Sequence, residues 1–141
     1  MDITSAAIAS VLSTIVSVSV NLYVNKNGKR KDLNDQLDNI LKIAIQYPYL
    51  ENEDYTSLWK DNRSNKEDQH IRYDLYCTML FNYLERLCSF YKFNMIKIEE
   101  HIYIKDWIRL HKEYWLTPTS TYENIDGYSK EFRSLIKEIL E

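Results

Sequence analysis

The chain has 141 residues with only two glycines and two prolines, which argues against sheets built on tight turns and against glycine-rich phosphate loops. Its net charge of −3 conceals an asymmetry: Lys26, Lys29, Arg30 and Lys31 stand together, and residues 32–141 carry 14 basic and 20 acidic side chains. An acidic domain is a poor bulk binder of nucleic acid, whose phosphates require surplus lysine and arginine.

The first predicted element is a membrane-spanning helix. Residues 3–24 carry no charge, and as a helix they would be about 33 Å long, which matches a hydrocarbon core of about 30 Å. A cleavable signal peptide would have its positive charge before the apolar run, whereas here it follows. The positive-inside rule therefore predicts a single-pass protein of a bacterial inner membrane, with the N-terminus outside. The predicted parts are a span at 1–25, a basic juxtamembrane segment at 26–31 and a cytoplasmic domain at 32–141.

The predicted span is unusually polar, and its polar residues lie on one side. At 100° per residue, a wedge about 100° wide holds Ser10, Ser13, Thr14, Ser17 and Asn21. Small residues also recur every four positions, at Ser5, Ala9, Ser13 and Ser17, a spacing that lets helix backbones approach closely. This hydroxyl wedge favours a helix that associates with copies of itself around a polar contact or a water-filled lumen. The alternative is a plain anchor whose hydroxyls bond to their own i−4 carbonyls.

The basic residues that follow the span predict contact with lipid. Lys26, Lys29, Arg30 and Lys31 would lie at the headgroups of an anionic leaflet.

The rest of the chain has helical periodicity and predicts a bundle of about four helices. The expected helices cover about 31–46, 69–93, 98–115 and 128–140, and Pro48 ends the first of them. Residues 51–69 are rich in polar side chains and predict an exposed loop around a short turn at 55–59. The fold class is therefore all-α, with one N-terminal transmembrane helix before the bundle.

Cysteines and histidines give no cofactor or metal site. Cys77 and Cys88 are eleven residues apart on one expected helix, about 16 Å along its axis, which is too far for a disulfide. Two cysteines without clustered histidines are no zinc site. His111 lies inside an apolar stripe and is predicted to be a hydrogen-bonded core histidine. No cofactor is expected.

One loose motif bears on enzymatic activity. Arg63 and His70 are separated by six residues, and this spacing resembles the arginine–histidine motif of HEPN nucleases, in which the two side chains bind and cleave RNA. The HEPN motif sits near a helix start, whereas this one is expected in a polar loop. The prediction is that the chain is not an enzyme, with Arg63 and His70 as its only catalytic candidates.

Taken together, the single span, the basic segment, the helical domain and the degenerate arginine–histidine motif resemble the small HEPN-related membrane accessory protein of type VI-B CRISPR systems. The resemblance implies a homo-oligomeric pore that perturbs the inner membrane in antiviral defence, beside an RNA-guided nuclease or another defence component. Two alternatives stay open. One is a membrane-tethered ribonuclease that uses Arg63 and His70, and the other is an anchored scaffold for a cytoplasmic partner. Uncharacterised single-span bacterial proteins with helical domains share the same layout.

Overall fold

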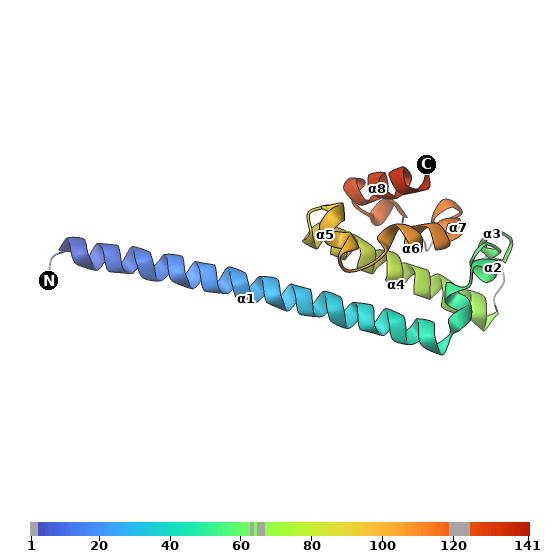
Figure 1. Ribbon diagram of the computed structural model, residues 1–141, viewed down its shortest axis with the longest axis horizontal. Helices are drawn as coiled ribbons and strands as arrows, with labels where there is room; N and C mark the ends of the chain where they lie inside the picture. The colour runs from blue at the N-terminus through green and yellow to red at the C-terminus, as the bar shows by residue number, and fades with distance from the viewer. Residues whose placement is uncertain (1–2, 63, 65–66, 119–124) are drawn as a thin grey trace. The chain divides into compact units, whose positions relative to one another are not determined.

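The structure, a computed structural model, confirms the predicted all-α class (Figure 1). It describes the backbone of residues 3–62, 64, 67–118 and 125–141, and the side chains of these residues except 3–17 and 125. Within these ranges there is no strand. The α-helices are α1 (Ile3–Gln46), α2 (Glu53–Thr56), α3 (Trp59–Asn62), α4 (Asp68–Phe90), α5 (Met95–Glu99), α6 (Ile104–Leu110), α7 (Lys112–Leu116) and α8 (Lys130–Leu140), and the 3-10 helices are η1 (Pro48–Glu51) and η2 (Ile125–Gly127).

Two compact units make up the chain, Met1–Asp35 and Gln36–Glu141. Gly28 and the basic segment 26–31 lie inside α1, so this segment is helical and continues the N-terminal helix. A Cβ atom at Gly28 would meet no atom within 4 Å, so no close contact requires a glycine at this position.

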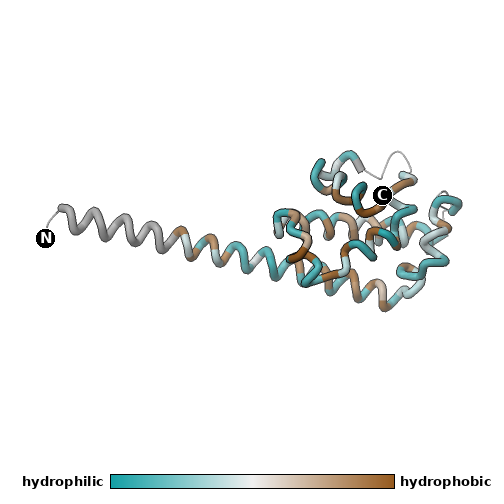
Figure 2. The backbone as a smooth tube through the Cα atoms, turned by 45° about the horizontal axis from the view of Figure 1, so that its top comes forward, coloured by the Kyte–Doolittle hydropathy of each residue, from teal (hydrophilic) through white to brown (hydrophobic). Residues whose placement is uncertain are grey.

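The first unit consists of the N-terminal part of α1. All its side chains from residue 18 to residue 32 are exposed, and Figure 2 shows apolar residues giving way to hydrophilic ones along this stretch. Among the side chains that the structure describes, no helix combines the length and the apolar character needed to cross a membrane. Of the predicted contact residues, Asn21 is exposed, and the others lie outside the described side chains: Ser5, Ala9, Ser10, Ser13, Thr14 and Ser17.

The second unit is built on α4, which runs antiparallel to the last turns of α1 (Figure 1). The Arg86 guanidinium donates to Gln36 Oε1 at 3.2 Å near one end of this pair. At the other end, Arg72 donates to Tyr49 Oη at 2.8 Å and lies 4.1 Å from the centre of the Tyr47 ring. These contacts fasten the end of α1 along α4.

An aromatic core fills the space between α4 and the later helices. The Trp59 ring of α3 lies 5.8 Å from Tyr114 of α7, and Tyr114 stacks on Phe81 of α4 at 5.8 Å. Trp115 then meets Phe132 of α8 at 6.0 Å. Such edge-to-face and offset pairs add to the free energy of burial, so these aromatic contacts stabilise the packing of α3, α7 and α8 around α4.

The helix predicted over 98–115 is divided into α5, α6 and α7. Ile102 and Ile104 are both buried, at 9% and 0% exposure. Two residues are 200° apart on one helix, so both could not face the same core. The helix is therefore interrupted here: α5 ends at Glu99 and α6 begins at Ile104. The predicted loop at 51–69 is likewise partly helical, because Asn52 Oδ1 caps α2 by accepting from the Tyr55 N–H at 3.1 Å.

The C-terminus of α4 closes with a strained turn that predicts a stabilising substitution. The Phe93 N–H donates to Cys88 O at 2.8 Å and the Lys92 N–H to Ser89 O at 3.1 Å, the pair of bonds of a Schellman motif. Lys92 has φ 51°, where glycine is preferred. We expect Lys92→Gly to raise the free energy of unfolding by about 1 kcal/mol in thermal melts. Lys92→Ala, which keeps the Cβ, should give no such gain, and equal effects of the two changes would contradict the strain.

Candidate functional site

The structure places His70 differently from the sequence-based expectation. His70 lies in the first turn of α4 rather than in a polar loop, and it is 8% exposed. Its ring is 5.9 Å from that of Tyr55, and its buried Nδ1 has no hydrogen-bond partner among the described residues. Arg63 lies outside the described residues, so the geometry of the predicted pair stays a prediction.

The four basic residues of the predicted lipid contact are all exposed. Lys26, Lys29, Arg30 and Lys31 follow one another within α1. Their charges are therefore accessible to a headgroup or another anionic partner.

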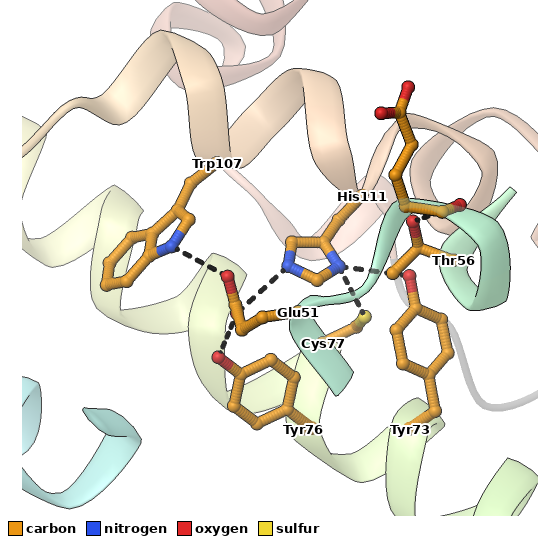
Figure 3. A network of polar contacts seen from close by, with 8 residues as sticks. Glu51, Thr56, Tyr73, Tyr76, Cys77, Trp107 and His111 are labelled. Carbon is orange, nitrogen blue, oxygen red and sulfur yellow. Dashed lines mark hydrogen bonds and ion pairs between the residues drawn. The ribbon is translucent and has the colours of Figure 1, made fainter. Parts of the chain in front are cut away.

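The main polar cluster of the described chain is centred on Glu51, which the sequence did not single out (Figure 3). Pro48 stands at the first position of η1, where its fixed φ suits a helix start, and Glu51 ends that short helix. The Tyr76 hydroxyl of α4 donates a short hydrogen bond to Glu51 Oε1. Trp107 Nε1 of α6 donates to Oε2 at 3.1 Å, and His111 Nε2 lies 3.3 Å from Oε1. The Glu51 carboxylate thus joins η1 to α4 through Tyr76, to α6 through Trp107, and to His111, which directly follows α6.

His111 carries the cluster into the core. It is fully buried between α6 and α7, and its Nδ1 lies 3.0 Å from Tyr73 Oη and 3.7 Å from Cys77 Sγ. Burial raises the pKa of Tyr73 far above its usual value, so the hydroxyl keeps its proton beside Nδ1. A carboxylate can only accept, so Nε2 carries a hydrogen and donates to Glu51. The prediction of a hydrogen-bonded core histidine is confirmed.

The charge of Glu51 is stabilised by these donors. Burial would raise its pKa, but the hydrogen bond and charge of His111, with the Tyr76 and Trp107 hydrogen bonds, hold the pKa below its usual value. The side chain is 26% exposed, so its outer edge touches solvent. A charged carboxylate with three donors is a satisfied buried anion.

The order Cys77, His111, Glu51 is that of a nucleophile, a base and an orienting carboxylate. However, Cys77 and His111 have no solvent exposure, and Tyr73 already occupies Nδ1. No substrate could reach the sulfur without opening the core. Among the described residues, no group of three histidines, cysteines or carboxylates is placed to hold a metal ion. We therefore interpret the cluster as a structural link.

Neither the scan against protein-family models nor the searches of curated proteins and of solved structures found a match for this chain. The functional argument therefore rests on the residues of the chain itself.

The lowered pKa of Glu51 predicts a component of stability that is lost in acid. Because the folded-state pKa of Glu51 lies below its usual value, the unfolded chain takes up the proton first as pH falls, and the free energy of unfolding decreases in acid. Near neutral pH we expect the unsubstituted chain to melt at a higher temperature than the Glu51→Gln variant. The difference between the two melting temperatures should disappear as pH falls through the folded-state pKa of Glu51. The exposed Glu138→Gln is the control, and a gap that persists in acid would contradict the assignment.

The absence of ribonuclease activity is a separate prediction. His70 is buried beside the Tyr55 ring, which suits a packing role better than proton transfer to a substrate. We expect purified chain to leave RNA intact, and Arg63→Ala and His70→Ala to change nothing in that assay. RNA cleavage that disappears when His70 is replaced would overturn this prediction.

Proposed function

We propose that the chain is a single-pass inner-membrane protein that associates with copies of itself through α1 and carries residues 36–141 as a cytoplasmic helical domain. Residues 3–24 would cross the bilayer, and the hydroxyl wedge would line the contact between copies or a lumen. This proposal makes no use of a catalytic residue or a cofactor.

The observation that carries the proposal is the exposure of α1. Its apolar side chains at Val18, Val20, Leu22, Tyr23 and Val24 are between 51% and 68% exposed. Isolated helices gain most of their stability in proteins by packing an apolar face. A bilayer and neighbouring helices would cover these side chains. The exposed basic residues that follow are suited to the cytoplasmic headgroups.

The polar wedge supports an assembly over a plain anchor. Serines and threonines on one side of a span let neighbouring helix backbones approach closely, and their hydroxyls can form hydrogen bonds between the helices. In a lumen the same hydroxyls would contact water and ions, and opening would dissipate the membrane potential. The resemblance to a defence accessory protein suggests an infected bacterium as the setting, with a nuclease or another defence component as the activating partner.

Topology is the experimental test of the anchoring. The two native cysteines are fully buried, so single cysteines introduced at Asp2 and Glu141 can be labelled selectively. A maleimide that does not cross membranes should label Asp2→Cys from outside intact cells and reach Glu141→Cys only after lysis. Labelling of Glu141→Cys from outside, or recovery of the chain in the soluble fraction, would overturn the proposal.

A further inference from the structure

We propose that residues 53–62 form a flap that opens locally and gives thiol reagents access to Cys77. This α2–α3 flap consists of the helices α2 and α3, of four residues each, and the residues between them. The inference concerns the second unit alone, so it depends neither on the anchoring of α1 nor on the orientation of the two units. It makes Cys77 a modification site that is covered in the closed structure.

The hydrogen bonds of the flap are the first argument. Those that the structure describes all run within residues 52–62, as does the bond that the Thr56 hydroxyl donates to Glu53 O at 3.3 Å. By contrast, three donors from the later helices hold Glu51, which directly precedes this stretch. The flap is therefore attached mainly by the packing of its buried side chains, and a single helical turn is not stable without such packing.

The polar atoms at this packing contact are the second argument. Three of them are buried without a hydrogen-bond partner among the described residues: Tyr55 Oη, Trp59 Nε1 and His70 Nδ1. They belong to one contact, because the Tyr55 ring lies 5.9 Å from that of His70, and the Tyr55 and Trp59 rings lie 5.6 and 5.2 Å from Tyr73. Unpaired buried polar groups raise the free energy of the closed state. Opening would hydrate all three, which favours local opening at this contact.

Tyr73 connects the flap to the thiol. Its side chain has no solvent exposure, and its hydroxyl lies 3.0 Å from His111 Nδ1, which in turn lies 3.7 Å from Cys77 Sγ (Figure 3). When the flap moves away, Tyr73 loses the Tyr55 and Trp59 rings that cover it, and water and small reagents can enter beside it. The exposed thiol then stands next to an imidazole, a base that favours the reactive thiolate.

Cys88 provides a comparison on the same helix. Cys77 and Cys88 are both fully buried in α4, and eleven residues, about 16 Å of helix, separate them. The ring contacts described between the flap and α4 involve His70 and Tyr73, which both precede Cys77. Opening of the flap should therefore expose Cys77 and leave Cys88 covered until the domain unfolds as a whole.

The test is the rate at which a maleimide labels each native cysteine of the full chain in mild detergent, resolved by mass spectrometry of the peptides. The sulfur adds to the maleimide double bond and the thiol proton passes to the neighbouring carbon. We expect Cys77 to react about tenfold faster than Cys88 or more. Low concentrations of urea should hardly change the rate at Cys77 but raise the rate at Cys88 steeply, because global unfolding exposes far more surface than flap opening. Equal rates with equal urea dependence would overturn the proposal.

Tyr55→Phe tests whether the flap is the element that opens. The substitution removes the unpaired hydroxyl and keeps the ring that packs on Tyr73, so it should favour the closed state and slow the labelling of Cys77 by about tenfold. If another element moved away instead, this hydroxyl would stay buried in both states and the rate would not change. Tyr103→Phe, at a side chain that is 81% exposed, is the control and should leave the rate unchanged. Labelling of Cys77 that is as fast in Tyr55→Phe as in Tyr103→Phe would contradict the flap.

Discussion

Replacing His111 with alanine should destabilise the helical domain more than any other single change to a polar side chain described above. The substitution removes the Nε2 donor to Glu51, leaves the Tyr73 hydroxyl without its His111 partner and opens a cavity at a position with no solvent exposure. We expect a loss of about 3–5 kcal/mol, as for truncation of a large buried side chain that also leaves buried polar groups unpaired. For a domain whose total stability is about 5–15 kcal/mol, this is a large fraction.

The measurement is thermal unfolding of the full chain followed by tryptophan fluorescence. All three tryptophans, Trp59, Trp107 and Trp115, lie in the second unit, so the signal reports on the domain that holds the cluster. His101→Ala is the matched control, because His101 is exposed and bonds only Tyr91 at 2.6 Å among the described residues. If His111→Ala melted within a few degrees of His101→Ala, the cluster would not be the link that we describe.

The second large effect is expected on assembly. Ser13→Leu and Ser17→Leu raise the hydrophobicity of the predicted span, so each single helix should insert more readily. We nonetheless expect both variants to lose the oligomer and the effect on membrane potential, because leucine at a small-residue contact blocks close approach of helix backbones or occludes a lumen. The measurements are oligomer size in detergent and the membrane potential of expressing cells.

Changes on the opposite side of the same helix provide the control. Ile8→Leu and Ile15→Leu keep volume and hydrophobicity on the side predicted to face lipid, so assembly should persist. A plain anchor would tolerate all four changes equally. Unchanged assembly and unchanged potential in both serine variants would leave the tethered scaffold as the better account.

Long elements with regular periodicity were predictable from the sequence. The 3.6-residue spacing of apolar side chains predicted helices over 69–93 and 128–140. The structure has α4 at Asp68–Phe90 and α8 at Lys130–Leu140 there. The stripe from Ile104 to Trp115 was also read correctly as core, since Ile104, Ile108 and Tyr114 are all buried. Which face of a helix is buried depends on the spacing of apolar residues along that helix, so it can be predicted from the local sequence.

The partner of His111 was not predictable in the same way. Glu51 stands at the start of a polar stretch and is 60 residues away from His111 in the chain. Nothing in its neighbours distinguishes it from Glu53 or Asp54, because its role depends on where η1 lies relative to α4 and α6. The buried histidine implied that some acceptor exists, but only the tertiary structure identifies it.

The breaks within 98–115 were missed for a related reason. The pattern there fits one helix face well except at Ile102, and a single apolar residue off the stripe is common on a protein surface. Only its burial, together with that of Ile104, reveals that the chain must turn. The arginine–histidine motif was assigned to a polar loop because most of its residues are polar, although His70 itself falls within the predicted helix 69–93 and lies in the first turn of α4.

The most direct test of the proposed function is particle imaging of the full chain, extracted from membranes in detergent and kept in a lipid disc. The account predicts particles in which several copies of α1 cross the disc side by side, with the wedge residues Ser13 and Ser17 turned toward one another and the helical domains on one face. Particles that hold a single chain with an isolated α1, or chains that never enter the disc, would contradict it.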